Sequence, residues 1–291
     1  MSFVNISSYK FVSIPEGELP ELRAYLKEET LKLGLKGTIL LSTEGVNQFL
    51  AGTREAIEAY KKLMAAHPYF GVLTYKESPS DTQPFSRMLV RLKKEIISMG
   101  CPEIRPAEAT APHLSPEELK RWYQEGKEMV VLDTRNDYEI RLGSFDSAVD
   151  LNIKSFRDFP EAIKKLPVEM KNKPIVSFCT GGIRCEKASQ LLINNGFKEV
   201  YQLDGGILNY FEQCGGDYYQ GECFVFDKRV AVDSNLQETK TIQCFACRNP
   251  LSVAEQEAAR GKCPYCGADK FLKGPVGPTH ELASSDLEEN N

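Results

Sequence analysis

The sequence reads Cys179-Thr180-Gly181-Gly182-Ile183-Arg184 between an apolar segment typical of a buried strand, residues 173–178, and a helical pattern over residues 185–193. The two glycines let backbone N–H groups turn into the loop, and the start of the helix adds a positive potential. Such a field lowers the pKa of a thiol and stabilises a thiolate or a persulfide. We therefore expect Cys179 to be catalytic, with Arg184 supplying the fixed side-chain charge of its cradle. The other cradle residues are Thr180, Gly181, Gly182 and Ile183.

The loop also has a plainer interpretation, in which Cys179 is a buried cysteine in an ordinary connection between strand and helix, because free cysteine is commonly buried. The two glycines, the arginine and the helix start together favour the reactive interpretation. Cys185 directly follows Arg184. It is either a resolving thiol for an oxidised Cys179 or a small structural residue in the first helical turn, and the structural role is favoured.

The sequence around the loop resembles the rhodanese family from about residue 115 to residue 216. The family's early strand-end motif is similar to Leu132-Asp133-Thr134-Arg135 followed by Tyr138-Glu139, and its closing glycine turn is similar to Tyr201-Gln202-Leu203-Asp204-Gly205-Gly206-Ile207. The resemblance implies that Cys179 carries sulfur. Alternating strand and helix patterns predict an α/β fold, with a parallel sheet covered by helices and the cysteine at a strand's carboxyl end. Residues 143–148 lack the histidine that rhodanese domains often carry there, but that histidine is not the nucleophile.

The N-terminal part, residues 1–110, has the pattern of a ferredoxin-like, or acylphosphatase-like, α+β domain. Strands are expected at residues 9–14, 37–42, 46–51, 72–76 and 85–93, and helices at residues 18–33 and 53–66. The βαββαβ order is that of a ferredoxin-like domain. A proline-rich linker follows over residues 101–112 and leads to the rhodanese-like domain, residues 111–216.

Two cysteine pairs lie in the C-terminal part, residues 217–273. They read Cys244-Phe245-Ala246-Cys247 and Cys263-Pro264-Tyr265-Cys266, with 15 residues between the pairs. This spacing predicts a zinc ribbon, in which Cys244, Cys247, Cys263 and Cys266 bind one structural zinc ion. The alternative is a degenerate ribbon that has lost its metal. Residues 274–291 are polar and rich in glycine and proline at their start, so we expect a disordered tail.

Composition bounds the remaining possibilities. The chain has 291 residues and nine cysteines, an odd number that fits a reducing compartment. Because the sequence lacks a long apolar run and a signal-peptide pattern at its start, we expect no membrane association and a cytoplasmic location. No glycine-rich nucleotide fingerprint occurs, so no nucleotide cofactor is indicated. With only three histidines, His67, His113 and His280, a two-histidine iron centre is not expected.

Charge is unevenly distributed along the chain. The net charge of −5 argues weakly against nucleic-acid binding. Residues 1–110, however, carry 14 Lys and Arg against 13 Asp and Glu. Near the end of this part Arg105 and four other basic residues outnumber the acidic residues and form a basic strip that could contact phosphates. The first candidates for tRNA contact are Arg87, Arg91, Lys93 and Lys94. The alternative is a solvated strand face.

Residues 5–270 as a whole closely resemble the bacterial tRNA uridine-34 hydroxylase family. The motifs that carry this resemblance are Cys179 to Lys187, Phe156-Arg157-Asp158-Phe159-Pro160 and Gly221-Glu222-Cys223-Phe224-Val225-Phe226-Asp227. The resemblance implies O2-dependent 5-hydroxylation of the wobble uridine in the tRNA anticodon loop, with a persulfide-bearing Cys179 and an electron donor that the sequence does not identify. The alternative function is a sulfurtransferase that passes persulfide sulfur to a protein or a small thiol. A non-catalytic binding module is disfavoured because Cys179 and Arg184 are both present.

Overall fold

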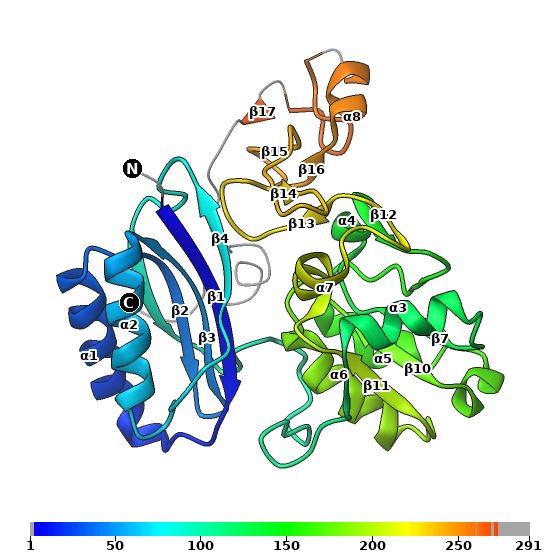
Figure 1. Cartoon of the computed structure of the whole chain (residues 1–291), viewed down its shortest axis with the longest axis horizontal. Helices are drawn as coiled ribbons and strands as arrows, with labels where there is room; N and C mark the ends of the chain where they lie inside the picture. The colour runs from blue at the N-terminus through cyan, green and yellow to red at the C-terminus, as the bar shows by residue number, and fades with distance from the viewer. Residues whose placement is uncertain (1–2, 260, 269–270, 273–291) are drawn as a thin grey trace. The chain divides into compact units, whose positions relative to one another are not determined.

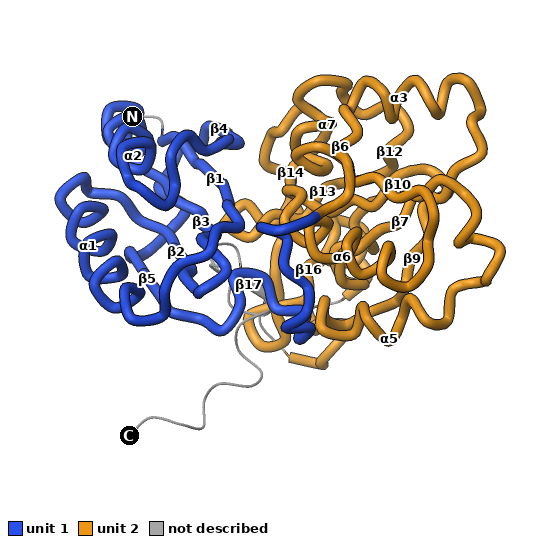
Figure 2. The backbone as a smooth tube through the Cα atoms, turned by 90° about the horizontal axis from the view of Figure 1, so that it is seen from below, with its two compact units in different colours: residues 1–109 blue, residues 110–291 orange. Residues whose placement is uncertain are grey.

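The chain forms two compact units, residues 1–109 and residues 110–291 (Figure 2). The computed structural model describes residues 3–259, 261–268 and 271–272. The predicted disordered tail, residues 274–291, lies outside the described residues. In the part of the chain that the structure describes, no helix combines the length and the apolar character that crossing a membrane requires.

The first unit is an α+β fold built on one five-stranded sheet, in the order β4-β1-β3-β2-β5. Its elements are β1 (Phe3–Phe11), η1 (Glu16–Glu18), α1 (Leu19–Lys32), β2 (Lys36–Ser42), β3 (Gly45–Gly52), α2 (Arg54–Ala66), β4 (Lys76–Ser80) and β5 (Met88–Leu92). The pairs β1–β3, β2–β3 and β1–β4 are antiparallel, whereas β5 runs parallel to β2. Helices α1 and α2 lie side by side over the sheet (Figure 1). This arrangement confirms the predicted ferredoxin-like fold, and β5 confirms the further strand expected within residues 85–93.

Helix α2 shows how the local sequence produces this packing. The Thr53 hydroxyl accepts a hydrogen bond from the Ala56 N–H at 3.2 Å and so satisfies one of the free donors of the first turn. Ile57, Tyr60 and Met64 follow at helical spacing and are fully buried in the core of the unit.

Two strand positions in this unit differ from the prediction. The strand expected at residues 72–76 lies instead at β4, and Val72 is 88% exposed. Pro79 is tolerated in β4 because this strand is at the edge of the sheet and pairs only with β1. Strand β1 begins at Phe3 rather than at Tyr9. The polar residues before Tyr9 fit into the strand because their buried side chains are hydrogen-bonded: the Asn5 amide, for example, donates to the Ser78 carbonyl at 3.1 Å.

The second unit contains a five-stranded parallel sheet in the order β6-β11-β10-β7-β9. Its elements up to residue 214 are β6 (His113–Leu114), α3 (Pro116–Gln124), β7 (Val130–Asp133), α4 (Asp137–Ile140), β8 (Gly143–Phe145), β9 (Val149–Asp150), η2 (Phe156–Asp158), α5 (Phe159–Ile163), η3 (Val168–Asn172), β10 (Ile175–Phe178), α6 (Ile183–Asn194), β11 (Val200–Leu203) and α7 (Gly206–Cys214). Helices α3 and α7 share a core with Val131 and Val176 on one face of the sheet. Helix α6 lies on the other face, where Gln202 donates to Glu186 at 3.0 Å. The parallel sheet covered by helices confirms the predicted α/β architecture.

The chain after residue 216 continues from this sheet through short strands. These elements are β12 (Tyr219–Gly221), β13 (Cys223–Phe224), β14 (Ala231–Val232), β15 (Ile242–Cys244), β16 (Pro250–Leu251), α8 (Val253–Ala258) and β17 (Phe271–Leu272). Strand β12 pairs antiparallel with β8, and β13 pairs with β14. Strand β15 pairs with β16 and β17 beside the four predicted metal ligands.

Candidate active site and metal centre

The predicted cysteine loop lies at the carboxyl end of β10, the central strand of the parallel sheet, and leads directly into α6. Gly182 has φ of +95° and is the N-cap residue of α6, a conformation that glycine adopts at little cost. Its N–H donates to the Cys179 Sγ atom at 3.1 Å. Cys179 itself is fully buried. The loop thus forms the cradle that the sequence predicts, with a backbone donor aimed at sulfur.

The surroundings of Cys179 favour its thiolate. Burial raises the pKa, but a hydrogen bond from the Cys185 thiol, the charge of Arg184 and the N–H groups of Arg184 and Gly181 outweigh burial and lower the pKa to about 5. Burial and the adjacent Cys179 raise the pKa of Cys185 well above its ordinary value. At neutral pH Cys179 is therefore the anion and Cys185 its hydrogen-bond donor.

Arg184 is held by a partner that the sequence reasoning did not assign. Two of its guanidinium N–H groups donate to the Glu139 carboxylate at 2.6 and 2.7 Å, and the two side chains are 3% and 0% exposed. Glu139 in turn accepts a hydrogen bond from the Asn136 N–H at 3.2 Å, which closes the first turn of α4. The Tyr138-Glu139 pair was a visible signal in the sequence, but a motif does not show which residue 45 positions away it contacts.

The start of α7 packs directly against the cysteine loop. The Ile207 N–H donates to the Cys179 carbonyl at 3.0 Å, and the Leu208 N–H donates to the Thr180 carbonyl at 3.1 Å. Gly206 has φ of +68°, and a Cβ atom added there would lie 2.4 Å from the Cys179 carbonyl oxygen. The glycine turn at residues 205–206 therefore permits this close approach.

A segment beyond the rhodanese-like part completes the site. The Thr180 hydroxyl lies 3.4 Å from both the Glu139 carboxylate and the Phe224 carbonyl oxygen. The Arg184 guanidinium lies over the Phe226 ring, 5.7 Å from its centroid. Residues 223–232, which the sequence suggested only as a short strand, thus contribute two short strands and an aromatic neighbour to the cysteine centre. No sequence signal linked them to the loop.

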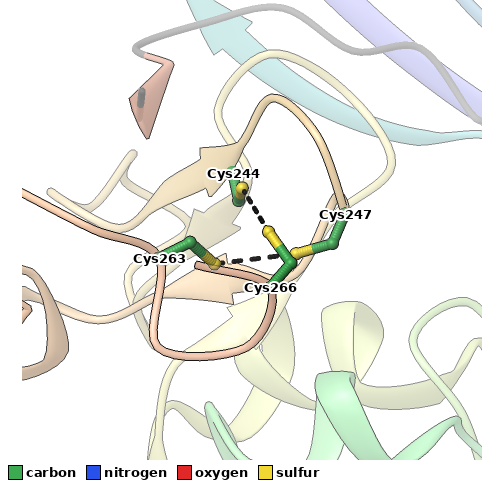
Figure 3. Close-up of side chains that lie close together, drawn as sticks. All are labelled: Cys244, Cys247, Cys263 and Cys266. Atoms are coloured by element: carbon green, nitrogen blue, oxygen red, sulfur yellow. Dashed lines mark hydrogen bonds between the residues drawn. The ribbon is translucent and has the colours of Figure 1, made fainter. Parts of the chain in front are cut away.

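The four predicted metal ligands also come together. The sulfur atoms of Cys244, Cys247, Cys263 and Cys266 all lie within 4.8 Å of one another. The Cys244–Cys266 and Cys247–Cys263 sulfur distances are both 3.7 Å (Figure 3). The Asn249 amide donates to the Cys247 sulfur at 3.5 Å. Four thiols in this arrangement, with an amide donor behind one of them, fit a tetrahedral metal ion.

The four basic residues proposed for phosphate contact lie in and beside β5, an edge strand of the first unit. Arg91 lies within β5, whereas Arg87 precedes the strand and Lys93 and Lys94 follow it. Arg87 and Lys94 are exposed, and Arg91 and Lys93 are half-buried. The four residues are thus close in sequence around one edge strand, and the structure assigns them no ligand.

Comparison with known protein families matches both parts of the fold. Residues 3–96 match the family described as the UPF0176 acylphosphatase like domain. Residues 115–213 match the rhodanese-like domain. Among solved structures, a rhodanese-like domain from Anabaena sp. is 23% identical and covers 38% of this chain and 79% of its own, with a TM-score of 0.32. A TM-score this low supports no argument about the whole chain.

Similarity over nearly the full length is found with curated bacterial proteins. A protein from Cupriavidus necator named "tRNA uridine(34) hydroxylase" is 50% identical over 279 residues, which cover 93% of this chain and 98% of that protein. A protein of the same name from Paraburkholderia xenovorans is 46% identical and covers 92% of this chain and 98% of its own. On this evidence the chain belongs to the tRNA uridine(34) hydroxylase family.

Proposed function

We propose that this protein hydroxylates uridine 34 of tRNA to 5-hydroxyuridine, with O2 as co-substrate and Cys179 as the catalytic residue. The observation that carries the proposal is the identity of about half of all residues, over nearly the whole chain, with proteins named for this activity. The buried thiolate in a backbone N–H cradle supports the role of Cys179.

The overall reaction has a fixed balance. One atom of O2 becomes the hydroxyl group on C5 of the uracil ring, and the other leaves as water with two protons and two electrons. In this proposal a persulfide on Cys179 supplies the two electrons and is itself oxidised to the sulfenic acid level, because sulfur of this kind is oxidised stepwise. Two molecules of a cellular thiol then reduce it to the persulfide and leave as a disulfide, with the second oxygen atom released as water. The Gly182 N–H and the Cys185 thiol stabilise the sulfur anion before substrate binds.

The remaining site residues receive supporting roles. Arg87, Arg91, Lys93 and Lys94 contact tRNA phosphates. We assign zinc to the four-cysteine site, because thiolates about 2.3 Å from a tetrahedral zinc ion lie about 3.8 Å apart. Two of the sulfur pairs are 3.7 Å apart, and all four sulfur atoms lie within 4.8 Å of one another. When bound, zinc would hold the ribbon together. We also propose that the domains end at residues 110, 216 and 273, and that the protein is cytoplasmic.

Nucleoside analysis of tRNA tests the function. In cells that lack the gene, wild-type protein should restore 5-hydroxyuridine and Cys179→Ser should not, because serine keeps the volume and removes the nucleophile. Cys214→Ser is the matched control, since Cys214 ends α7 and is only partly buried. Wild-type levels of 5-hydroxyuridine from the Cys179→Ser variant would contradict the proposal.

A second candidate function is sulfur transfer without oxygen. The match of residues 115–213 to the rhodanese-like domain and the low pKa of Cys179 favour it. The thiolate would take the outer sulfur of thiosulfate and release sulfite, and the persulfide would then pass that sulfur to a thiol acceptor. Sulfite release under anaerobic conditions, with no change in tRNA nucleosides, would support this function over hydroxylation.

A further inference from the structure

The cysteine cluster carries an unusual share of the exposed aromatic surface. Among the side chains that the structure describes, three aromatic rings are exposed, and two of them are Phe245 (55%) and Tyr265 (40%). Each lies between the two cysteines of one pair, at the tip of the turn that presents the sulfur atoms. We call Phe245 and Tyr265 the knuckle aromatics. Neither belongs to the hydrophobic cluster formed by Cys244, Leu251 and Cys263, so the packing around the sulfur atoms does not account for them.

Each knuckle aromatic is paired with an arginine. The Arg248 guanidinium lies over the Phe245 ring, 5.0 Å from its centroid. The Arg141 guanidinium lies over the Tyr265 ring at 4.2 Å, and it also donates to the Asn249 side chain at 3.1 Å. Residues 240–268 carry four Lys and Arg against two Glu. Four thiolates around a zinc ion would add a charge of about −2, so the positive charge beside the rings comes from Arg141 and Arg248 rather than from the module as a whole. Two exposed rings, each with a guanidinium against it, therefore occur together at the four-cysteine cluster.

We propose that the knuckle aromatics, with Arg141 and Arg248, form a binding site for single-stranded RNA, in which unstacked bases lie on the two rings. Aromatic rings provide stacking surfaces for bases, and arginine beside them adds a cation–π contact and a phosphate partner. Proteins that recognise loops of RNA use this combination because loop bases are free to leave their stack. The identity of the RNA as a tRNA anticodon loop rests on the proposed function, whereas binding to a single strand does not.

Binding of a fluorescent oligouridine of about ten nucleotides to the full-length protein tests the site. Phe245→Leu and Tyr265→Leu, which remove the ring but keep an apolar side chain, should each weaken binding about tenfold. Phe245→Tyr should bind oligouridine like wild type, because it keeps an aromatic ring at this position. Val253→Ala is the matched control, since Val253 is an exposed apolar residue of the same module and is 39% exposed. It should bind like wild type.

The salt dependence of binding separates the contribution of Arg248 from that of the Phe245 ring. Arg248→Gln leaves Phe245 and all four cysteines in place. It should make the plot of log affinity against log salt concentration less steep, by the amount expected for the loss of one phosphate contact. Metal content and a thermal melt accompany each variant, so that lost binding is compared only among folded proteins. A blunt RNA duplex of the same length should bind equally to wild type and to the leucine variants.

Three results would overturn the inference. They are absent binding of oligouridine by the wild type, full affinity in the folded Phe245→Leu/Tyr265→Leu double variant, and an equal loss of duplex binding in that variant. Capture of a protein by these rings, with RNA affinity unchanged, would also overturn it. If the wild-type protein binds oligouridine but tRNA from cells that contain it lacks 5-hydroxyuridine, the proposed reaction fails while the RNA site stands.

Discussion

Arg184 and Glu139 form a bidentate ion pair inside the protein, with both side chains almost completely buried. The charge that lowers the pKa of Cys179 is therefore also the charge that neutralises a buried carboxylate. Removing either member leaves the other uncompensated in a medium of low dielectric constant.

Arg184→Ala should for this reason destabilise the fold as well as the thiolate. We expect the free energy of unfolding to fall by about 3–5 kcal/mol, as for other broken buried pairs, and the pKa of Cys179 to rise. Urea unfolding measures the first effect. The Arg184→Ala/Glu139→Gln double variant is the control and should regain part of the lost stability, because the carboxylate charge is gone. An Arg184→Ala protein as stable as wild type would show that the pair contributes little.

The low pKa of Cys179 predicts how stability depends on pH. An unfolded cysteine ionises near pH 8.5, whereas folded Cys179 ionises at about 5. Between these values the unfolded state binds more protons, so stability gained from the thiolate grows as pH rises, is complete above about pH 9 and is lost as pH falls through 5. The difference in stability between wild type and Cys179→Ser should follow this course. Thiolate absorbance should give a midpoint near 5, and a midpoint near 9 would contradict the assignment.

Cys185 can be assigned by two substitutions. Cys185→Ser keeps a hydrogen-bond donor beside Cys179, and Cys185→Ala removes it. If Cys185 positions and stabilises the thiolate, the serine variant should keep a low Cys179 pKa and most activity, while the alanine variant loses both in part. If Cys185 is a resolving thiol, the two variants should lose activity equally. Thiolate absorbance and tRNA 5-hydroxyuridine measure the two properties.

Gly206→Ala should disturb the cysteine loop, because the new Cβ would meet the Cys179 carbonyl oxygen at 2.4 Å. Gly196→Ala is the matched control. Gly196 also has positive φ, at +85°, but a Cβ atom added there would meet no atom of the described residues within 4 Å, so it tests backbone strain alone. We expect the control to cost about 1 kcal/mol and to keep its activity, and Gly206→Ala to cost more and to lose activity. Equal losses of stability and activity in the two variants would show that the whole effect comes from the positive φ.

The four-cysteine site should hold one zinc ion per chain. Cys247→Ser should release it and lower the melting temperature of the ribbon, because structural zinc binding is coupled to folding. Elemental analysis of protein purified without chelator measures the content. Cys101→Ser, which removes a cysteine from the other unit, should retain full zinc. Metal-free wild-type protein with an intact fold would show that the site is degenerate.

Local motifs predicted the parts of the site that are close in sequence. The cysteine loop and each cysteine pair were predictable, because a few neighbouring residues determine a turn and the donors it presents. The contacts of Glu139, Phe224 and Gly206 were not, since they depend on how distant segments pack. Strand β4 was misplaced for a related reason: its sequence, Lys-Glu-Ser-Pro-Ser, has little strand propensity, and pairing with β1 supplies the hydrogen bonds that propensity does not.

The contact of Thr180 with the Phe224 carbonyl has a consequence for the history of the chain. This contact joins the cysteine loop to residues that follow the rhodanese-like match at 115–213, and the pairing of β12 with β8 joins the same C-terminal segment to another part of that match. A segment cut at those limits and transplanted elsewhere would leave this closing piece behind. The rhodanese-like part of this protein is therefore not an independent domain that can be exchanged alone. We expect it to recombine in evolution only together with its C-terminal extension.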